Sequence, residues 1–212
     1  MENAAERIAI FDLDGTLVDS APDICMAINH VRCLWDLPVL ETAEVRPLIG
    51  GGLRTLLVQT GTVVGGKNME ASRNAFVRYY AQHHLDQTQP YPHVQSMLAR
   101  RTRTAVVTNK PRRFGELVLA RFGWSFDTVV YGDDGYGRKP DGAPLLRALR
   151  CLDSTPEDAV FIGDTVLDVQ AGMAAGIETW LVPWADQQIH HKRLINLEQL
   201  DGILSPSETA RP

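Results

Sequence analysis

Residues 8–20 read IAIFDLDGTLVDS and carry both a strand pattern and a pair of acids. Its first part, Ile8–Asp12, is an apolar run without alternation, which is typical of a strand buried on both faces of a parallel sheet. Asp12 and Asp14 lie two residues apart, so we expect both carboxylates to face one site at the carboxyl end of that strand. Two adjacent carboxylates repel each other and need a cation, a shared proton or separate roles, unless they form only a solvated acidic turn. The following Gly15 lets backbone N–H groups approach an anion.

Four more segments share the apolar character of the first strand, and helical patterns alternate with them. The predicted strands are Ile8–Asp12, Thr104–Thr108, Thr128–Tyr131, Ala159–Ile162 and Thr179–Val182. The predicted helices between and after them are Arg112–Phe122, Leu145–Leu152, Val166–Ala175 and Asn196–Leu204. This alternation favours an α/β fold with a doubly wound, Rossmann-like parallel sheet, whose ligands bind at the carboxyl ends of the strands.

The chain between the first two strands is organised differently. From about Ser20 to about Gln87 the sequence shows no convincing strand, and a connection of that length cannot be a bare loop in a compact domain. Helical patterns cover Ala21–Trp35, Leu53–Thr60 and Met69–His84. We therefore expect residues 20–87, called the helical insert below, to form a separate all-helical domain over the sheet. Residues 1–19 and 88–212 are expected to form the Rossmann-like core.

Composition narrows the class of protein. The 212 residues carry a net charge of −5, with 44% hydrophobic and 22% charged residues, which suits a soluble globular protein rather than a disordered chain or a coiled coil. The acidic balance argues against a general nucleic-acid partner, and no apolar run is long enough to span a membrane. The N-terminus lacks a signal-peptide pattern, and the three cysteines form no CxxC pair, so we expect a cytoplasmic protein.

Polar residues also follow the second and third predicted strands. Thr108 and Asn109 lie in the segment TNKP, where a hydroxyl and free N–H groups at a helix start suit a phosphate oxygen. Both residue types are also common helix N-caps, which is the alternative interpretation. Lys139 follows the third strand and can act as a point charge on a phosphate or carboxylate, although a solvated lysine is the alternative there.

Two acids follow the fourth predicted strand in the segment GDTVLD, residues 163–168. Asp164 and Asp168 can face the same strand ends, and carboxylate oxygens in such a place suit a hard cation such as Mg²⁺. Acids are also favourable at a helix N-terminus without any ion. All of these segments fall at the carboxyl ends of strands, and together they supply the nucleophile, the charge compensation and the oxygen-binding groups that phosphoryl transfer needs.

In order and spacing these segments resemble the four signatures of the haloacid dehalogenase superfamily of phosphohydrolases, over nearly the whole chain. The helical insert resembles the small helical cap of one subclass. Within that subclass, the segments that look most like phosphoglycolate phosphatases are Tyr91-Pro92, VTNKP at 107–111, Lys139-Pro140 and DVQAG at 168–172.

The resemblance implies a role for each acid. Asp12 would attack phosphorus and form an aspartyl phosphate, and Asp14 would protonate the leaving group and later activate water. Mg²⁺ would be the cofactor, bound by Asp12, Asp164 and the backbone carbonyl of Asp14. Asp168 would support the metal through water or through Lys139, which would also steady the nucleophile and the phosphate.

The resemblance also implies the groups that bind the substrate. The phosphoryl oxygens would be bound by Thr108, Lys139 and backbone N–H groups near Leu13, Gly15 and Asn109. In the helical insert, Arg54 or Arg46 would pair with a carboxylate of the substrate, with Lys67 as a further option. Each of these three charges is otherwise a solvated residue on a helix. His93 stands where phosphoglycolate phosphatases usually have glycine.

The expected function is that of a Mg²⁺-dependent phosphatase of small phosphorylated metabolites, with phosphoglycolate as the first candidate. The same signatures also allow a pyrophosphatase, a sugar-phosphate phosphatase or a phosphomutase. A catalytically dead protein that binds a phosphate ligand is the non-enzymatic alternative. We expect a monomer or a homodimer.

Overall fold

The computed structural model describes residues 7–63, 69–100 and 103–205. A five-stranded sheet lies at its centre in the order β5-β4-β1-β6-β7, and all neighbouring strands are parallel. The strands are β1 (Ile8–Phe11), β4 (Thr104–Val107), β5 (Thr128–Val130), β6 (Ala159–Gly163) and β7 (Glu178–Leu181). The predicted α/β fold is confirmed, and every predicted strand lies within one residue of its observed bounds.

Strand β1 occupies the middle of this sheet. Ile10 is paired with Ala105 of β4 on one side and with Phe161 of β6 on the other. The chain runs from β1 through β4 to β5 and then returns to β6 on the opposite side, so the order of strands reverses at β1. In open α/β sheets such a reversal opens a crevice at the carboxyl ends of the strands, and β1 ends there just before Asp12.

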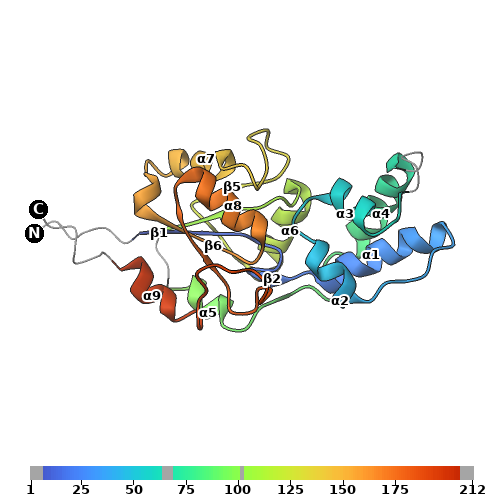
Figure 1. Ribbon diagram of the computed structural model, residues 1–212, viewed down its shortest axis with the longest axis horizontal. Coiled ribbons are helices and arrows are strands. Elements are labelled where there is room, and N and C mark those ends of the chain that lie inside the picture. The colour runs from blue at the N-terminus through green and yellow to red at the C-terminus, as the bar shows by residue number, and fades with distance from the viewer. Residues whose placement is uncertain (1–6, 64–68, 101–102, 206–212) are drawn as a thin grey trace, which may run out of the picture.

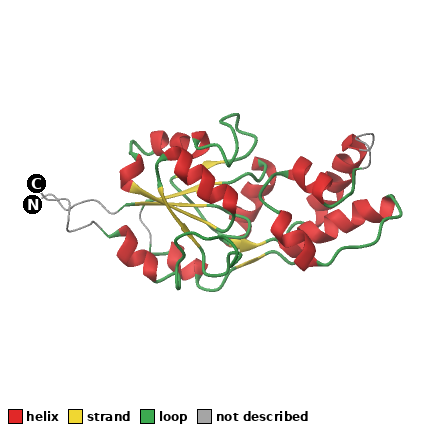
Figure 2. Ribbon diagram, in the orientation of Figure 1, coloured by secondary structure: helices red, strands yellow, loops and turns green. Residues whose placement is uncertain are grey.

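Helices cover both faces of the sheet (Figures 1 and 2). They are α5 (Val94–Leu98), α6 (Arg112–Phe122), α7 (Ala143–Cys151), α8 (Val166–Ala175) and α9 (Gln199–Leu204). Ala9 and Phe11 of β1 pack in one hydrophobic cluster with α5, α6 and α9, whereas Ile8 and Ile10 pack in another with α7 and α8. Burial of alternate side chains on two faces explains why the strands are continuous apolar runs.

Two of these helices, α6 and α8, have the bounds that the sequence predicts. Helix α7 begins at Ala143, because Pro144 is accepted in the first turn of a helix, and α9 begins only at Gln199. The sequence did not indicate α5, which is only five residues long and follows a left-handed residue, His93 with φ 67°.

The helical insert lies at one end of the molecule, beyond the carboxyl ends of the strands (Figure 1). Its described residues form α1 (Ala21–Leu34), α2 (Thr42–Val45), the 3-10 turn η1 (Arg46–Leu48), α3 (Leu53–Gln59) and α4 (Met69–His83). They enclose a third hydrophobic cluster, which includes Ile28, Leu57 and Phe76 and is joined by Phe114 of α6. The predicted helices α1, α3 and α4 are observed, each ending one residue before its predicted bound, and the four-residue α2 is too short to show a helical period.

A two-stranded antiparallel pair joins the insert to the sheet. Strand β2 (Val18–Asp19) leaves the core and pairs with β3 (Gln89–Pro90), which returns to it. Beside this pair, the fully buried Asp23 carboxylate accepts hydrogen bonds from the Gln87 N–H and from the N–H and hydroxyl of Thr88, at 2.7 to 3.1 Å. One carboxylate thus fixes the entry and the exit of the helical insert against each other.

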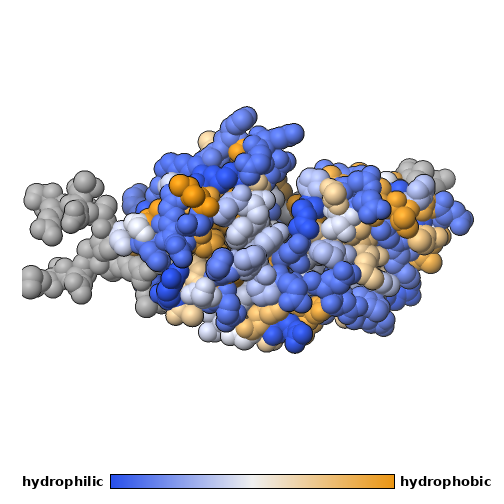
Figure 3. Space-filling view, turned by 90° about the horizontal axis from the view of Figure 1, so that it is seen from below, coloured by the Kyte–Doolittle hydropathy of each residue, from blue (hydrophilic) through white to orange (hydrophobic). Residues whose placement is uncertain are grey.

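The surface agrees with the composition. The face seen in Figure 3 is mostly hydrophilic, with hydrophobic residues in small separate groups. Among the described residues, no helix combines the length and the apolar character needed to cross a membrane.

Candidate active site

The carboxyl ends of β1, β4 and β6 bring the predicted site residues to one place. Asp12 and Asp14 follow β1, Thr108 and Asn109 follow β4, and Asp164 and Asp168 follow β6. Lys139 arrives from the connection between β5 and α7. The crevice that strand order predicts is therefore the place where the four sequence segments meet.

Lys139 is the centre of a buried charge network. Its Nζ lies 2.7 Å from Asp12 Oδ1 and 2.6 Å from Asp168 Oδ1, and all three side chains are almost completely shielded from solvent. A solvated lysine, the alternative for Lys139, is therefore not observed. Because an ammonium between two buried carboxylates compensates their charge, Lys139 holds Asp12 in place at the strand end.

Asp168 serves two structural needs at once. Its Oδ2 accepts hydrogen bonds from the Thr165 N–H, the Thr165 hydroxyl and the Asp164 N–H, which is a capping box at the start of α8, while Oδ1 faces Lys139. The helix-cap interpretation of this acid is therefore confirmed, and the same side chain also belongs to the buried charge network. With both oxygens engaged and 0% exposure, Asp168 is placed to orient its neighbours.

Asp164 lies against the glycine of the first segment. Its Oδ1 accepts a hydrogen bond from the Thr16 hydroxyl at 2.9 Å. Gly15 has a φ of +87°, and a Cβ at this position would overlap the Asp164 carboxylate. The glycine is therefore required both by its backbone conformation and by the closeness of this side chain.

Asp12, Asp164 and Asp168 offer carboxylate oxygens that all lie within 4.8 Å of one another. Three acids so close together, with one ammonium among them, leave an excess of negative charge. Oxygen donors at this density are what a hard divalent cation such as Mg²⁺ prefers, so the residues present fit such an ion. The Asp14 side chain is not a member of this cluster, because its carboxylate is turned toward Lys110.

The electrostatics of the cluster agree with an uncompensated charge. Burial raises the pKa of Asp12 to about 7, although the charge of Lys139 opposes this rise. Burial also raises the pKa of Asp164 well above its usual range, and the charges of Asp168 and Asp12 add to the effect. Burial alone would lower the pKa of Lys139, but Asp12 and Asp168 outweigh it and raise that pKa. A cation at this place would favour the ionised form of all three acids.

Asn109 has a structural task that the sequence did not reveal. Its Nδ2 donates to the Lys139 carbonyl at 2.9 Å, its Oδ1 accepts from the Lys139 N–H at 3.0 Å, and Nδ2 also donates to the Gly50 carbonyl of the insert at 2.8 Å. Neither Thr108 nor Asn109 caps α6, which has no side-chain cap; the Arg112 N–H donates to Asp133 instead. The N-cap interpretation is therefore wrong for both residues.

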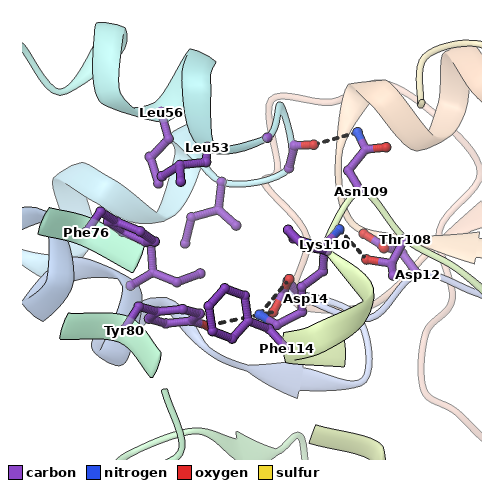
Figure 4. Close-up of a pocket in the computed structure, with 15 residues that line it drawn as sticks. Asp12, Asp14, Leu53, Leu56, Phe76, Tyr80, Thr108, Asn109, Lys110 and Phe114 are labelled. Carbon is purple, nitrogen blue, oxygen red and sulfur yellow. Dashed lines mark hydrogen bonds and ion pairs between the residues drawn. The ribbon is translucent and has the colours of Figure 1, made fainter. Parts of the chain in front are cut away.

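Asp14 is held by side chains that sequence reasoning passed over. Lys110 Nζ lies 2.8 Å from its Oδ1 and 3.1 Å from its Oδ2 (Figure 4). The Ser20 hydroxyl donates to Oδ1 at 2.6 Å. Lys110 also donates to the Tyr80 hydroxyl of α4 at 2.9 Å. Burial would lower the pKa of Lys110, but Asp14 and Tyr80 outweigh it and raise that pKa. Lys110 stands in the TNKP segment, yet its distant partners could not be read from it.

Two cavities border these residues at the junction with the insert. The smaller, of ≈ 80 Å³, is reached by Asp12, Asp14, Thr108 and Lys110, and apolar side chains of the insert form much of its wall (Figure 4). They include Ile24, Leu53, Leu56 and Phe76. The larger, of ≈ 730 Å³, is more polar and is bordered by Asp14, Gly15, Lys139 and Asp164.

The predicted cationic residues of the insert differ in their placement. Arg46 borders the larger cavity and binds Asp19 with both guanidinium nitrogens, at 2.7 and 2.9 Å. Arg54 is exposed on α3 and is not among the residues that border either cavity, so the structure does not bring it to the site. Lys67 lies outside the described residues.

Two aromatic residues, Tyr91 and Trp184, also border the larger cavity. Trp184 stacks on Tyr91 with ring centroids 4.4 Å apart, and its Nε1 donates to the Gly15 carbonyl at 2.8 Å. Trp184 therefore supports the glycine turn that lies against Asp164.

Comparisons with known proteins agree with this geometry. A model of the haloacid dehalogenase-like hydrolase family matches residues 9–182. The chain is 35% identical to a phosphoglycolate phosphatase of Aquifex aeolicus, over 84% of this chain and 85% of that protein. It is 32% identical to the N-acetylmuramic acid 6-phosphate phosphatase of Pseudomonas aeruginosa, over 84% of this chain and 82% of that protein.

A solved structure supports the same relationship. The crystal structure of a predicted phosphoglycolate phosphatase from Haemophilus somnus superposes with a TM-score of 0.85 at 25% identity, over 93% of this chain and 97% of that one. The resemblance carried by the four segments is thereby confirmed. The order of the strands, the meeting of the acids and lysine at their ends, and the family match lead to one conclusion: the chain belongs to the haloacid dehalogenase-like hydrolase family.

Proposed function

We propose that this protein is a Mg²⁺-dependent phosphatase of small phosphate monoesters that works through an aspartyl phosphate on Asp12. One observation supports the proposal most strongly: Asp12 and Asp14 lie two residues apart, yet their side chains contact different residues. Asp12 belongs to the buried acid cluster with Lys139, whereas Asp14 faces Lys110 and Ser20 outside it. Separate surroundings for neighbouring carboxylates are what a nucleophile and a proton carrier require.

In the first step a carboxylate oxygen of Asp12 forms a bond to phosphorus, and the bond from phosphorus to the ester oxygen breaks. The Asp14 carboxyl gives its proton to that oxygen, so the product leaves as an alcohol. In the second step Asp14, now a carboxylate, takes a proton from water as the water oxygen attacks phosphorus. The bond from phosphorus to the Asp12 oxygen breaks, inorganic phosphate leaves, and both acids return to their starting states.

Asp12 and Asp164, with the backbone carbonyl of Asp14, are the proposed holders of Mg²⁺, and Asp168 supports them through Lys139. When bound, the ion supplies positive charge that lets an anionic nucleophile approach a phosphate. Lys139, Thr108 and the backbone N–H groups near Leu13, Gly15 and Asn109 are the proposed partners of the phosphoryl oxygens.

The helical insert, residues 20–87, is proposed to act as a cap domain over the core formed by residues 1–19 and 88–212. Its hydrophobic cluster, to which the core adds only Phe114 among the buried residues, and the β2–β3 pair at its two ends support this division. A cap that closes on the substrate excludes water from the reaction.

Phosphoglycolate is the first candidate substrate, because relatives along most of the chain carry that name. Arg46 is the better placed partner for a substrate carboxylate, since Arg54 borders neither cavity. A sugar phosphate is the second candidate, favoured by the ≈ 730 Å³ cavity beside Asp14 and by the N-acetylmuramic acid 6-phosphate phosphatase among the relatives. We further propose that the protein is cytoplasmic and is a monomer or a homodimer. The competing functions are those of a pyrophosphatase, a phosphomutase and an inactive protein that binds a phosphate ligand.

The test is phosphate release from a panel of phosphorylated metabolites, with Mg²⁺ and with EDTA, and with Asp12→Asn as the control. Release that needs Mg²⁺ and disappears in the variant supports the proposal. Preference for a sugar phosphate would replace the first candidate substrate. Folded protein that releases phosphate from no compound would refute the phosphatase and favour the mutase or the binding protein.

A further inference from the structure

The side chain of Asp14 is held from the core and from the helical insert at once. Lys110 of the core contacts both of its carboxylate oxygens, and Tyr80 of α4 in the insert contacts Lys110 in turn. The Lys110 side chain is 4% exposed and that of Asp14 is 12% exposed. This chain of contacts crosses the boundary between the two parts of the molecule next to the proposed proton carrier.

The contacts leave Lys110 little freedom. An ammonium group has three donors, and here its partners are the two oxygens of Asp14 and the hydroxyl of Tyr80. Ser20 adds a further donor to Asp14 from the start of α1. The orientation of the Asp14 carboxylate is therefore set by Lys110 and Ser20 together, rather than by its own backbone alone.

The position of Tyr80 depends on how the insert packs on the core. Its ring stacks on Phe76 of the same helix with centroids 5.2 Å apart, and meets Phe114 of α6 edge-on at 4.9 Å. Phe114 belongs to the core, although its side chain is part of the hydrophobic cluster of the insert. Tyr80 can therefore reach Lys110 only while α4 lies against α6.

We propose that Tyr80 and Lys110 are positioning residues, through which helix α4 of the insert fixes the Asp14 carboxylate for proton transfer with the leaving group. The inference rests on the proposed phosphatase function and adds to it a dependence of acid–base chemistry on the packing of the insert. Neither residue touches the substrate in this account. Both act through Asp14.

Such a role has a signature that a merely structural role lacks. An alkyl phosphate releases a strongly basic oxygen, which needs the proton from Asp14, whereas 4-nitrophenyl phosphate releases a stable anion that does not. Proton transfer by a positioned side chain contributes roughly 10²–10⁴-fold to a rate. A misplaced Asp14 therefore slows release of an alkyl alcohol much more than release of 4-nitrophenolate.

The experiment compares single-turnover release of the alcohol from 4-nitrophenyl phosphate and from the preferred alkyl phosphate of the panel. Tyr80→Phe removes only the hydroxyl and keeps the packing on Phe76 and Phe114. We expect it to slow the alkyl ester about tenfold and the aryl ester less than about twofold. Lys110→Met should slow the alkyl ester roughly a hundredfold with the same asymmetry.

Tyr79→Phe is the matched control, since Tyr79 neighbours Tyr80 on α4 but stacks on His30 and His83 away from the site. It should behave as the wild type with both esters. If Tyr80→Phe slows both esters equally, or neither, the inference is wrong although the phosphatase stands. If the wild type hydrolyses neither ester, the proposed function itself has failed. Should Lys110→Met not fold, Tyr80→Phe alone decides.

Discussion

The side-chain amide of Asn109 clamps the backbone of Lys139, with Nδ2 donating to its carbonyl at 2.9 Å and Oδ1 accepting from its N–H at 3.0 Å. The same Nδ2 donates to the Gly50 carbonyl in the helical insert. One amide thus places the lysine that compensates the buried acids and also ties it to the insert. The segment after β4 is therefore a support of the active site as well as a part of it.

Asn109→Ala tests this clamp. We expect turnover to fall at least about tenfold and the free energy of unfolding to fall by about 1–3 kcal/mol, because buried backbone groups of Lys139 lose their partners. Asn29 makes the same two-way clamp on Leu40 inside the insert, with both bonds at 2.8 Å, so Asn29→Ala is a matched control. It should lower stability without the loss in turnover. Equal losses of turnover in both variants would contradict the clamp.

Lys139→Met removes the only ammonium that contacts Asp12 and Asp168 among the described residues. Breaking a buried pair on one side costs about 3–5 kcal/mol, so the variant should melt well below the wild type and lose turnover. Because negative charge in the cluster increases, Mg²⁺ should raise the melting temperature of the variant more than that of the wild type. Differential scanning calorimetry with and without Mg²⁺ measures this, and an equal shift in both proteins would contradict the assignment of the ion to this cluster.

Gly15→Ala brings a Cβ into the place of the Asp164 carboxylate. We expect the response of the melting temperature to Mg²⁺ to disappear, together with turnover, because Asp164 must move. Gly123→Ala provides the comparison, since Gly123 also has a positive φ, +68°, but no atom lies within 4 Å of the added Cβ. That variant should lose only about 1 kcal/mol of stability and keep its response to Mg²⁺. A normal Mg²⁺ response in Gly15→Ala would show that the close approach is unimportant.

The ion pairs of Glu178, which lie outside the active site, make the stability of the folded protein depend on pH. Burial would raise the pKa of its carboxyl, but hydrogen bonds from Lys192 and Arg7 outweigh it and lower the pKa from 4.5 to about 2. Since the folded pKa lies below the unfolded one, the carboxylate contributes its full stability above the unfolded value and loses it as the pH falls toward 2.

Glu178→Gln should therefore be less stable than the wild type at neutral pH by up to about 1 kcal/mol, since the pair is partly exposed. The difference should shrink as the pH falls from about 5 to about 2. Urea unfolding at several pH values measures it. Glu116→Gln, at the more exposed ion pair with Arg112, is the control and should show a smaller difference. A difference for Glu178→Gln that stays constant with pH would disprove the origin assigned to it.

The sequence predicted the bounds of the strands well. Because β1, β4 and β6 are buried on both faces of the sheet, each is a continuous apolar segment that can be recognised in the sequence. It also placed Asp12 and Asp164 correctly at the strand ends, and Lys139 in the connection after β5. It missed the short elements, since α2 and α5 are too brief for a helical period. The β2–β3 pair joins residues on either side of the insert, and pairing across such a distance has no local signal.

The parts of the site that escaped prediction are contacts between distant segments. Lys110 was visible in TNKP, but its partners Asp14 and Tyr80 stand 96 and 30 positions away. Arg54 was proposed as a partner of the substrate carboxylate because its segment resembles that of phosphoglycolate phosphatases. The direction in which its side chain leaves α3, however, depends on how the helices of the insert pack. His93 was noted as a departure from glycine, and its left-handed φ of 67° shows why glycine suits that position.

Asp12 is the proposed nucleophile, and beryllium fluoride probes this role because it mimics a phosphoryl group on a carboxylate. Melting temperatures are measured with Mg²⁺, with beryllium fluoride and with both, for the wild type and for Asp12→Asn. We predict that the two additives together raise the melting temperature of the wild type beyond the sum of their separate effects, and that Asp12→Asn shows no such gain. The same gain in Asp12→Asn, or none in the wild type, would contradict the account.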